Sequence, residues 1–243
     1  MRIDKVLEEK GFGSRKTVKR LFQRKIVTVD GQIIEDGSYN VDSRLHRVLI
    51  DGQAITNFTH AYFMLNKPNG AVTAVKDRKW QTVIDLLEPT DVTAELYPVG
   101  RLDRDTEGLM LLTDNGQLGY QLLLPEKNVT KTYEAIINEK VTQEDIVAFA
   151  RGIEFIGGEV CKPAKLTILT SAEKESHVRL EIQEGKFHQV KKMFLATGKK
   201  VIGLKRIAMG PLELDETLAP GDYRPLTDAE LLSLKPYFTY KEG

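Results

Sequence analysis

Apolar and polar positions in the first fifty-five residues predict two helices followed by two hairpins. Residues 3–10 place their apolar side chains on one helical face, and two glycines then end the pattern. Residues 15–24 repeat that spacing after Ser14, a favourable N-cap. The segments "IVTVDGQII" and "RVLIDGQAI" each carry an Asp-Gly pair between short apolar runs, at Asp30 and at Asp51, which is a strong hairpin signal.

The pattern changes near residues 56–61, and longer apolar segments follow. The predicted strands are "AYFMLNKPNG", "LMLLT", "KTYEAIIN" and "HVRLEIQEG"; the predicted helices are residues 142–153, 186–198 and a last one from Thr227. Strands and helices interleave without a regular alternation, so we expect an α+β protein with a mixed, largely antiparallel sheet. We expect one small domain over residues 1–58 and a second over residues 59–243.

Composition places the chain among globular proteins. Of its 243 residues 41% are hydrophobic and 29% are charged. No apolar run approaches the roughly 18 residues of a membrane span, and the charged N-terminus lacks the apolar core of a signal peptide. Cys161 is the one cysteine, which excludes an internal disulfide and a cysteine-based zinc cluster. We therefore expect a cytoplasmic protein.

The net charge of zero hides two basic blocks. Residues 1–25 hold nine Lys and Arg against three Asp and Glu, and residues 186–212 hold seven against none. The second predicted helix presents Arg15, Lys16, Lys19, Arg20 and Arg24. Two local cationic surfaces on a neutral protein indicate contacts with a polyanion, and a basic helix beside a hairpin suits a small RNA-binding module. A solvated helix face and a small capping domain are the structural alternatives.

The stretch "YPVGRLDRDTEGLMLLTDNG" concentrates the candidate chemistry. Asp103, Asp105, Glu107 and Asp114 fit the spacing of a calcium-binding EF-hand loop, but the flanking helices that such a loop needs are not predicted. "DRDTE" also resembles an aspartyl-phosphate nucleophile motif, although there the apolar strand precedes the first aspartate and here it follows. A pair of carboxylates for glycoside hydrolysis and a plain charged turn stay open on these residues alone.

The same stretch resembles the signature of the RsuA-type bacterial pseudouridine synthases, a G-R-L-D core followed by T-x-G-L and an apolar strand. "MLNKPNGAVTA", "KTYEA", "EIQEGKFHQVKKMF", "VIGLKRIAMGPLEL" and "LAPGDYRPLTDAEL" resemble the family's other motifs in the same order. The N-terminal unit resembles the alpha-L RNA-binding fold of a small-subunit ribosomal protein. The resemblance covers nearly the whole chain.

The resemblance implies a set of site residues. It places the catalytic aspartate at Asp103, the active-site tyrosine at Tyr133, the cationic partner of the aspartate at Lys186 and the apolar residue that closes over the base at Leu204. Arg101 is an alternative partner or a phosphate contact. His188, Lys191 and Lys192 are expected to contact RNA, whereas Asp105 and Glu107 are expected only to shape the turn. Lysines stand where relatives often have arginine, which weakens the case for bidentate phosphate contacts.

The implied reaction breaks the bond between uracil N1 and the ribose, turns the base and rejoins it through C5. It needs neither metal nor cofactor, and one ionised carboxylate acts at the ribose, either on C1′ as a nucleophile or on the 2′ proton. "HQVK" in the third motif favours the small-subunit branch, with ribosomal RNA or a small-subunit assembly intermediate as partner, no membrane contact and a monomeric enzyme. A large-subunit enzyme and a non-catalytic RNA-binding assembly factor are the alternatives.

Overall fold

Two Asp-Gly turns shape the N-terminal sheet of the protein, seen here in a computed structural model that describes residues 1–238. Asp30 and Gly31 have φ of 51° and 85°, and Asp51 and Gly52 have φ of 49° and 80°. Two successive residues with positive φ form the turn whose twist matches a two-residue hairpin. The turns join β1 (Val27–Val29) to β2 (Gln32–Ile33) and β3 (Val48–Ile50) to β4 (Gln53–Ile55), in the antiparallel order β2-β1-β3-β4.

Helices α1 (Ile3–Glu9) and α2 (Arg15–Gln23) pack on this sheet and bury their predicted apolar faces in a core of their own. Ser14 is the N-cap residue of α2 as expected, but its side chain bonds to the Thr17 hydroxyl and not to a backbone amide. The four predicted cations in α2 and the fifth, Arg24, which is its C-cap residue, are all exposed. The helix therefore presents a continuous basic face to solvent.

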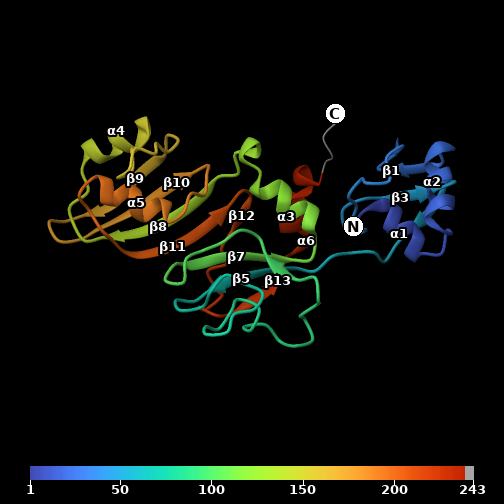
Figure 1. Cartoon of the computed structure of the whole chain (residues 1–243), viewed down its shortest axis with the longest axis horizontal. Coiled ribbons are helices and arrows are strands. Elements are labelled where there is room, and N and C mark those ends of the chain that lie inside the picture. Colours follow the sequence, from blue (N-terminus) through green and yellow to red (C-terminus); the bar gives the residue numbers. More distant parts are fainter. Residues whose placement is uncertain (239–243) are drawn as a thin grey trace.

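The second unit is built on a nine-stranded sheet, and Figure 1 shows it extending away from the N-terminal unit. Its strands are β5 (Tyr62–Lys67), β6 (Tyr97–Pro98), β7 (Glu107–Thr113), β8 (Lys131–Ile137), β9 (Lys165–Ser171), β10 (Ser176–Ile182), β11 (Val201–Met209), β12 (Leu212–Glu213) and β13 (Tyr223–Pro225). The main path is β13-β5-β7-β11-β8-β10-β9, with β6 beside β7 and β12 beside β11. Its pairs are antiparallel except β7 with β11, so the sheet is mixed as expected.

The parallel contact between β7 and β11 explains the glycine of the T-x-G-L signature. Gly108 lies opposite Arg206 with φ of 100°, and a Cβ atom there would sit 2.2 Å from the Arg206 carbonyl oxygen. No side chain fits at that separation, so only glycine lets the two strands meet. The junction joins the half of the sheet that contains β5, β7 and β13 to the half that contains β8 to β11. It directly follows the acidic turn, residues 100–106, in the sequence.

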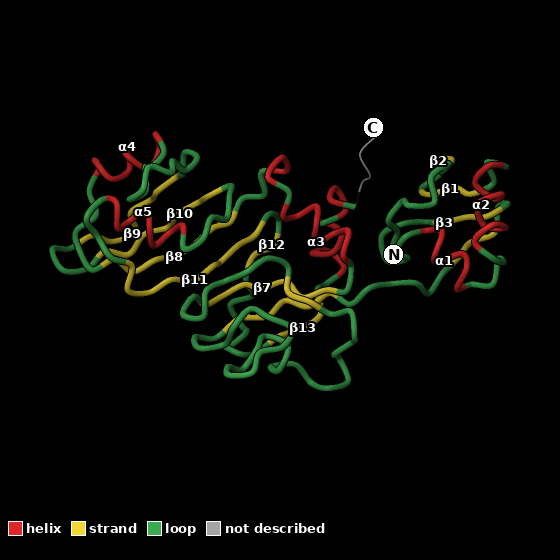
Figure 2. The backbone as a smooth tube through the Cα atoms, in the orientation of Figure 1, coloured by secondary structure: helices red, strands yellow, loops and turns green. Residues whose placement is uncertain are grey.

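Helices cover the two halves of the sheet separately, as the red segments of Figure 2 show. They are α3 (Gly116–Leu123), α4 (Gln143–Arg151), α5 (Gln189–Ala196), α6 (Asp228–Ser233) and the short 3-10 helices η1 (Pro125–Lys127) and η2 (Lys235–Tyr237). One hydrophobic core packs α4 and α5 against strands β8 to β10 and continues over one face of β5 and β7, and another lies beneath α3 and α6. The α+β fold class is thereby confirmed.

Two expectations about helices need correction. The segment 186–198 becomes helical only at Gln189, because His188 adopts a left-handed backbone conformation with φ of 53° and residues 186–188 form a turn. Helix α3 was not predicted, since Asn115 and Gly116 were interpreted only as the end of a strand. Asn115 in fact caps α3 by accepting a hydrogen bond from the Leu118 amide. The predicted starts of α4 after Thr142 and of α6 after Thr227 are confirmed.

Polar contacts join the N-terminal unit to the second unit. Asp42 accepts hydrogen bonds of 2.8 Å from both Tyr62 and Thr59, and Arg44 pairs with Asp228 at 2.6 Å. The expected division of the chain between residues 58 and 59 falls in the segment between β4 and β5 and stays a prediction. Residues 239–243 of the expected second domain lie outside the described residues.

Candidate active site

A buried lysine holds the acidic turn in place. Lys67, at the end of β5, is fully buried, and its ammonium donates to the carbonyls of Pro68, Arg104 and Thr106 at 3.0, 3.1 and 2.7 Å. Burial lowers its pKa to about 8 despite the nearby acids. Because two of these carbonyls belong to residues that flank Asp105, the lysine fixes the backbone of the G-R-L-D-R-D-T turn.

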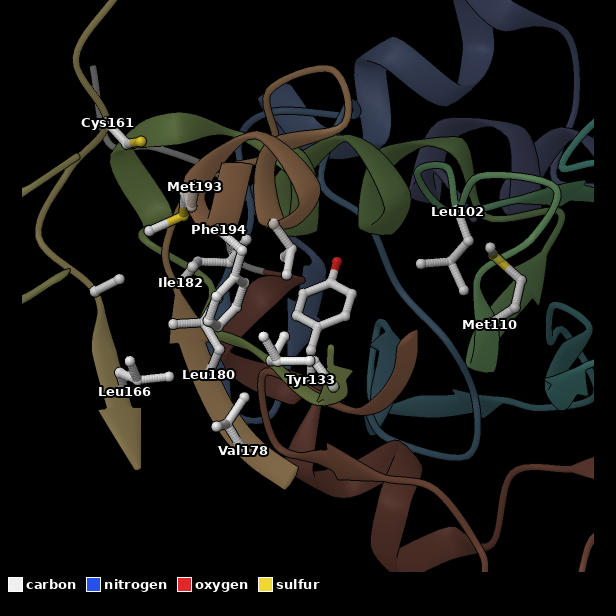
Figure 3. Packing of buried hydrophobic residues seen from close by; sticks show 14 of the residues in the cluster. Leu102, Met110, Tyr133, Cys161, Leu166, Val178, Leu180, Ile182, Met193 and Phe194 are labelled. Carbon is white, nitrogen blue, oxygen red and sulfur yellow. The ribbon is translucent and has the colours of Figure 1, made fainter. Parts of the chain in front are cut away.

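Asp103 lies at the edge of a small hollow that opens to solvent beside this turn. The hollow has a volume of about 70 Å³, and Tyr133, Ile182 and Leu204 form its apolar side. Figure 3 shows the ring of Tyr133 rising from β8 between Leu102 and the cluster around Phe194, with its hydroxyl directed away from the strand. The structure thus brings together three residues that are far apart in the sequence: Asp103 from the turn before β7, Tyr133 from β8 and Leu204 from β11.

The cation at the aspartate is Lys191, in the first turn of α5. Its ammonium lies 2.9 Å from Asp103 Oδ2 and 2.6 Å from Asp105 Oδ1. Burial lowers the pKa of Lys191, but hydrogen bonds to Asp105 and Asp103 outweigh it and the pKa is raised. The bond from Lys191 likewise lowers the pKa of Asp105. Asp105 is therefore part of the charge network, which corrects the expectation that it only shapes the turn.

Lys186, expected to be the partner of Asp103, points elsewhere. Its ammonium donates to the Val160 carbonyl at 2.7 Å and pairs with Glu159 at 3.1 Å. The reason is the late start of α5: Lys186 lies in the turn before the helix, while Lys191 lies on its first turn and faces the aspartate. Lys186 still lines the hollow, but the ion pair with Asp103 is made by the lysine five positions later.

His188 and Phe187 lie at the rim of the hollow. His188 Nε2 is 3.5 Å from Asp103 Oδ1, and its ring stacks on that of Phe187 with centroids 3.7 Å apart. Phe187 is 72% exposed. Lys192, expected to contact substrate, lies over the rings of Phe155 and Phe187, with its ammonium 5.5 and 5.3 Å from their centroids. Lys192 therefore does not line the hollow, whereas Lys191, the preceding residue, does.

A cationic groove of about 530 Å³ continues from the hollow. It shares Arg101, Tyr133 and Lys186 with the hollow and adds Lys131 and Arg206. Burial, then the charge of Arg206, lowers the pKa of Lys131. Glu184 also lines the groove and partly offsets this effect, but the cations outnumber it and favour an anionic group there. The groove falls in the size range of small-molecule sites, which the hollow alone does not.

The remaining acids of the stretch are separated in space. Glu107 begins β7 and lies in a different depression with Glu134 and Lys205, while Asp114 pairs with His60 at 2.8 Å. The four acids therefore do not converge as calcium ligands would. Within residues 1–238, no cluster of three or more His, Cys, Asp or Glu side chains has the geometry of a metal site.

Sequence reasoning missed two residues of the site. Lys67 is a charged residue inside a strand whose six positions are all buried, and that conflict with the apolar pattern was the available signal. Thr106 lines the hollow with a buried hydroxyl that has no hydrogen-bond partner among the described residues. Its place as the threonine of the T-x-G-L signature was the available signal, although no role for its hydroxyl was inferred from it.

Fold and site together define an enzyme of the pseudouridine synthase class, carried behind a small basic domain. Residues 61–196 match the RNA pseudouridylate synthase family and residues 1–44 match the S4 domain. The chain therefore belongs to the RNA pseudouridylate synthase family, which confirms the resemblance found in its motifs.

Full-length relatives support the assignment. An uncharacterised RNA pseudouridine synthase of Bacillus subtilis is 44% identical over 231 residues, covering 95% of this chain and 97% of that one. Ribosomal small subunit pseudouridine synthase A of Escherichia coli is 38% identical over 237 residues, covering 96% and 100%. A crystal structure of a pseudouridylate synthase matches with a TM-score of 0.67 at 37% identity, covering 96% of this chain and 99% of that one. None of the helices in residues 1–238 has the length and apolarity to cross a membrane.

Proposed function

We propose that this protein converts one uridine of small-subunit ribosomal RNA to pseudouridine, with Asp103 as the catalytic carboxylate. The observation that carries the proposal is the position of Asp103: its carboxylate is held by Lys191 at the rim of a hollow whose apolar side is Tyr133 and Leu204. A charged carboxylate against an aromatic surface is what a reaction at the C1′ to N1 bond of uridine requires.

The reaction breaks the bond between C1′ and N1, turns the uracil and forms a bond between C1′ and C5. The proton on C5 leaves and N1 gains one, so atoms and electrons balance without an added reagent. Asp103 acts on the ribose, either on C1′ or on the 2′ proton, and Lys191 stabilises its negative charge. Tyr133 supplies a stacking surface for the base and a hydroxyl that can carry a proton, and Leu204 covers the base.

The hollow is smaller than a nucleotide, so the substrate must also occupy the neighbouring groove. A uridine that leaves its stack costs a few kcal/mol, and contacts with Tyr133 and Leu204 recover part of that. Arg101, Lys131, Lys186 and Arg206 line the groove where the adjoining backbone phosphates would lie. His188 and Lys192 extend this contact at the rim, and the α2 cations Arg15, Lys16, Lys19, Arg20 and Arg24 form a second, shape-reading contact.

The names of the relatives support the small-subunit branch of the family. Proteins 38 to 39% identical over nearly the whole chain carry the name ribosomal small subunit pseudouridine synthase A. We therefore propose the uridine-516 class of site in 16S RNA, in free RNA or an assembly intermediate, and a cytoplasmic, monomeric enzyme that needs no cofactor.

Tritium release tests this proposal. Small-subunit RNA labelled at C5 of uracil should lose about one equivalent of tritium per molecule with the wild type and none with Asp103→Asn. Large-subunit RNA is the matched substrate control. Release by both proteins would remove Asp103 from the chemistry, release from large-subunit RNA alone would move the target, and release from neither RNA would leave a binding role.

A further inference from the structure

The only tryptophan of the chain lies in an exposed cationic loop. Trp80 is 41% exposed and follows Lys76, Arg78 and Lys79, all of them exposed. The loop belongs to the long connection between β5 and β6, drawn in teal and green below the sheet in Figure 1. Exposed tryptophan is uncommon on a protein surface and is enriched where a partner binds.

Two cations lie against the indole. The guanidinium carbon of Arg104 is 4.0 Å from the ring centroid, and the ammonium of Lys79 is 4.8 Å from it. Arg104 follows Asp103 directly in the sequence, so the indole is attached to the catalytic turn through one side chain. Its planar guanidinium orients the ring, while the flexible Lys79 chain can move aside.

Hydrogen bonds hold this loop in one shape beside the active site. The Asp77 carboxylate accepts from the amides of Lys79 and Trp80 at 2.8 and 2.9 Å, which uses the loop's one acid internally. Thr73 donates to the Leu102 carbonyl at 2.8 Å and accepts from the Leu102 amide at 3.1 Å. The loop is thus fixed both within itself and to the turn that carries Asp103.

We propose that Trp80, backed by Arg104, is a stacking platform for an unpaired RNA base next to the target uridine. This inference rests on the proposed function. Removing a uridine from its stack exposes the faces of the neighbouring bases, and an aromatic ring with flanking cations restores stacking to one of them. The cations Lys76, Arg78 and Lys79 then meet the phosphates of the same strand. A protein partner would need apolar surface, which the loop offers only at Val75 and Trp80.

Because Trp80 is the sole tryptophan, its fluorescence reports the contact directly. The experiment titrates Asp103→Asn protein, which cannot convert the RNA, with a transcript of the 5′ domain of 16S RNA, and measures binding in parallel by filter retention. We expect fluorescence to be quenched in step with binding. Trp80→Ala should weaken binding and raise KM roughly ten- to hundredfold, and Trp80→Phe should recover most of the loss.

Tyr120 is the matched control, since it is 62% exposed on α3 and lines neither the hollow nor the groove. Tyr120→Ala should leave RNA binding unchanged. Unmoved fluorescence at saturating RNA, or wild-type affinity and KM for Trp80→Ala, would overturn the platform while tritium release keeps the proposed function. Quenching of Asp103→Asn by the RNA, combined with no tritium release by the wild-type protein, would keep the platform and remove the proposed reaction.

Discussion

Lys191 Nζ lies 2.9 Å from Asp103 Oδ2 and joins helix α5 to the turn before β7. A single ammonium balances two carboxylates, because the same nitrogen contacts Asp105 at 2.6 Å. We expect Lys191→Met to lower kcat roughly 10²- to 10³-fold, since the carboxylate then loses the charge that stabilises it. Single-turnover tritium release measures the effect, and Lys191→Arg should keep part of the activity.

Lys186→Met is the matched control for Lys191. Lys186 pairs with Glu159 and lines the RNA groove without touching Asp103. Its replacement should raise KM for RNA and change kcat by less than about threefold. A loss of kcat as large as that of Lys191→Met would return the role of cationic partner to Lys186.

Thr106→Val separates stability from activity. The Thr106 hydroxyl is buried in the hollow without a partner among the described residues, and a buried unpaired hydroxyl lowers stability by about 1–3 kcal/mol. The near-isosteric valine should therefore leave the melting temperature equal or higher. If the hydroxyl bonds to substrate, the rate should fall about tenfold and Thr106→Ser should restore it. Full activity in the valine variant would assign the hydroxyl no part in substrate binding.

Lys67 predicts a particular pH dependence of stability. Its pKa is about 8 in the folded chain against 10.5 ordinarily, because it is buried. Between these two pH values the unfolded chain binds more protons at Lys67 than the folded chain does. The free energy of unfolding therefore increases as the pH rises from 8 to 10.5. Relative to Lys67→Met, the wild type should gain up to about 3 kcal/mol over this range in urea unfolding. A difference in unfolding free energy that stays constant between the two proteins across that pH range would contradict the lowered pKa of Lys67.

Local signals predicted most of the fold. The Asp-Gly turns, the strand in which buried and exposed positions alternate at β10 and the capped starts of α4 and α6 each depend on residues close in sequence. Helix α3 was missed because Asn115 can end a strand or cap a helix, and only its tertiary contacts decide between them. Asn115 also donates to the Tyr62 hydroxyl and accepts from Asn40, contacts more than fifty residues apart.

The site shows the same division. Asp103, Tyr133 and Leu204 follow from motifs and are brought to one hollow by the structure, although their catalytic roles remain proposals. The choice between Lys186 and Lys191 depended on where α5 begins, and one left-handed residue, His188, delays the helix by three positions. Helix boundaries are weakly determined by sequence pattern, and a start three residues later leaves Lys186 outside the helix while Lys191 stays in its first turn.

Gly108→Ala should test the junction of the two half-sheets. The added methyl group would overlap the Arg206 carbonyl at a residue whose φ is 100°, so both contact and backbone strain oppose it. We expect a loss of at least about 2 kcal/mol of unfolding free energy. Gly116→Ala is the control, because a Cβ there meets no atom within 4 Å and the residue begins helix α3; it should change stability by less than about 0.5 kcal/mol.

The basic face of α2 should appear in the salt dependence of RNA binding. Each phosphate contact contributes about 0.7 to 0.9 to the slope of log affinity against log salt concentration. Lys19→Gln should therefore lower this slope by up to about 1 and weaken binding uniformly, without changing kcat at saturating RNA. Lys174, exposed between β9 and β10 on the other unit, is the matched control for the lost charge. Equal slopes for Lys19→Gln and Lys174→Gln would mean that the α2 face is a solvated surface and that RNA is held by the catalytic unit alone.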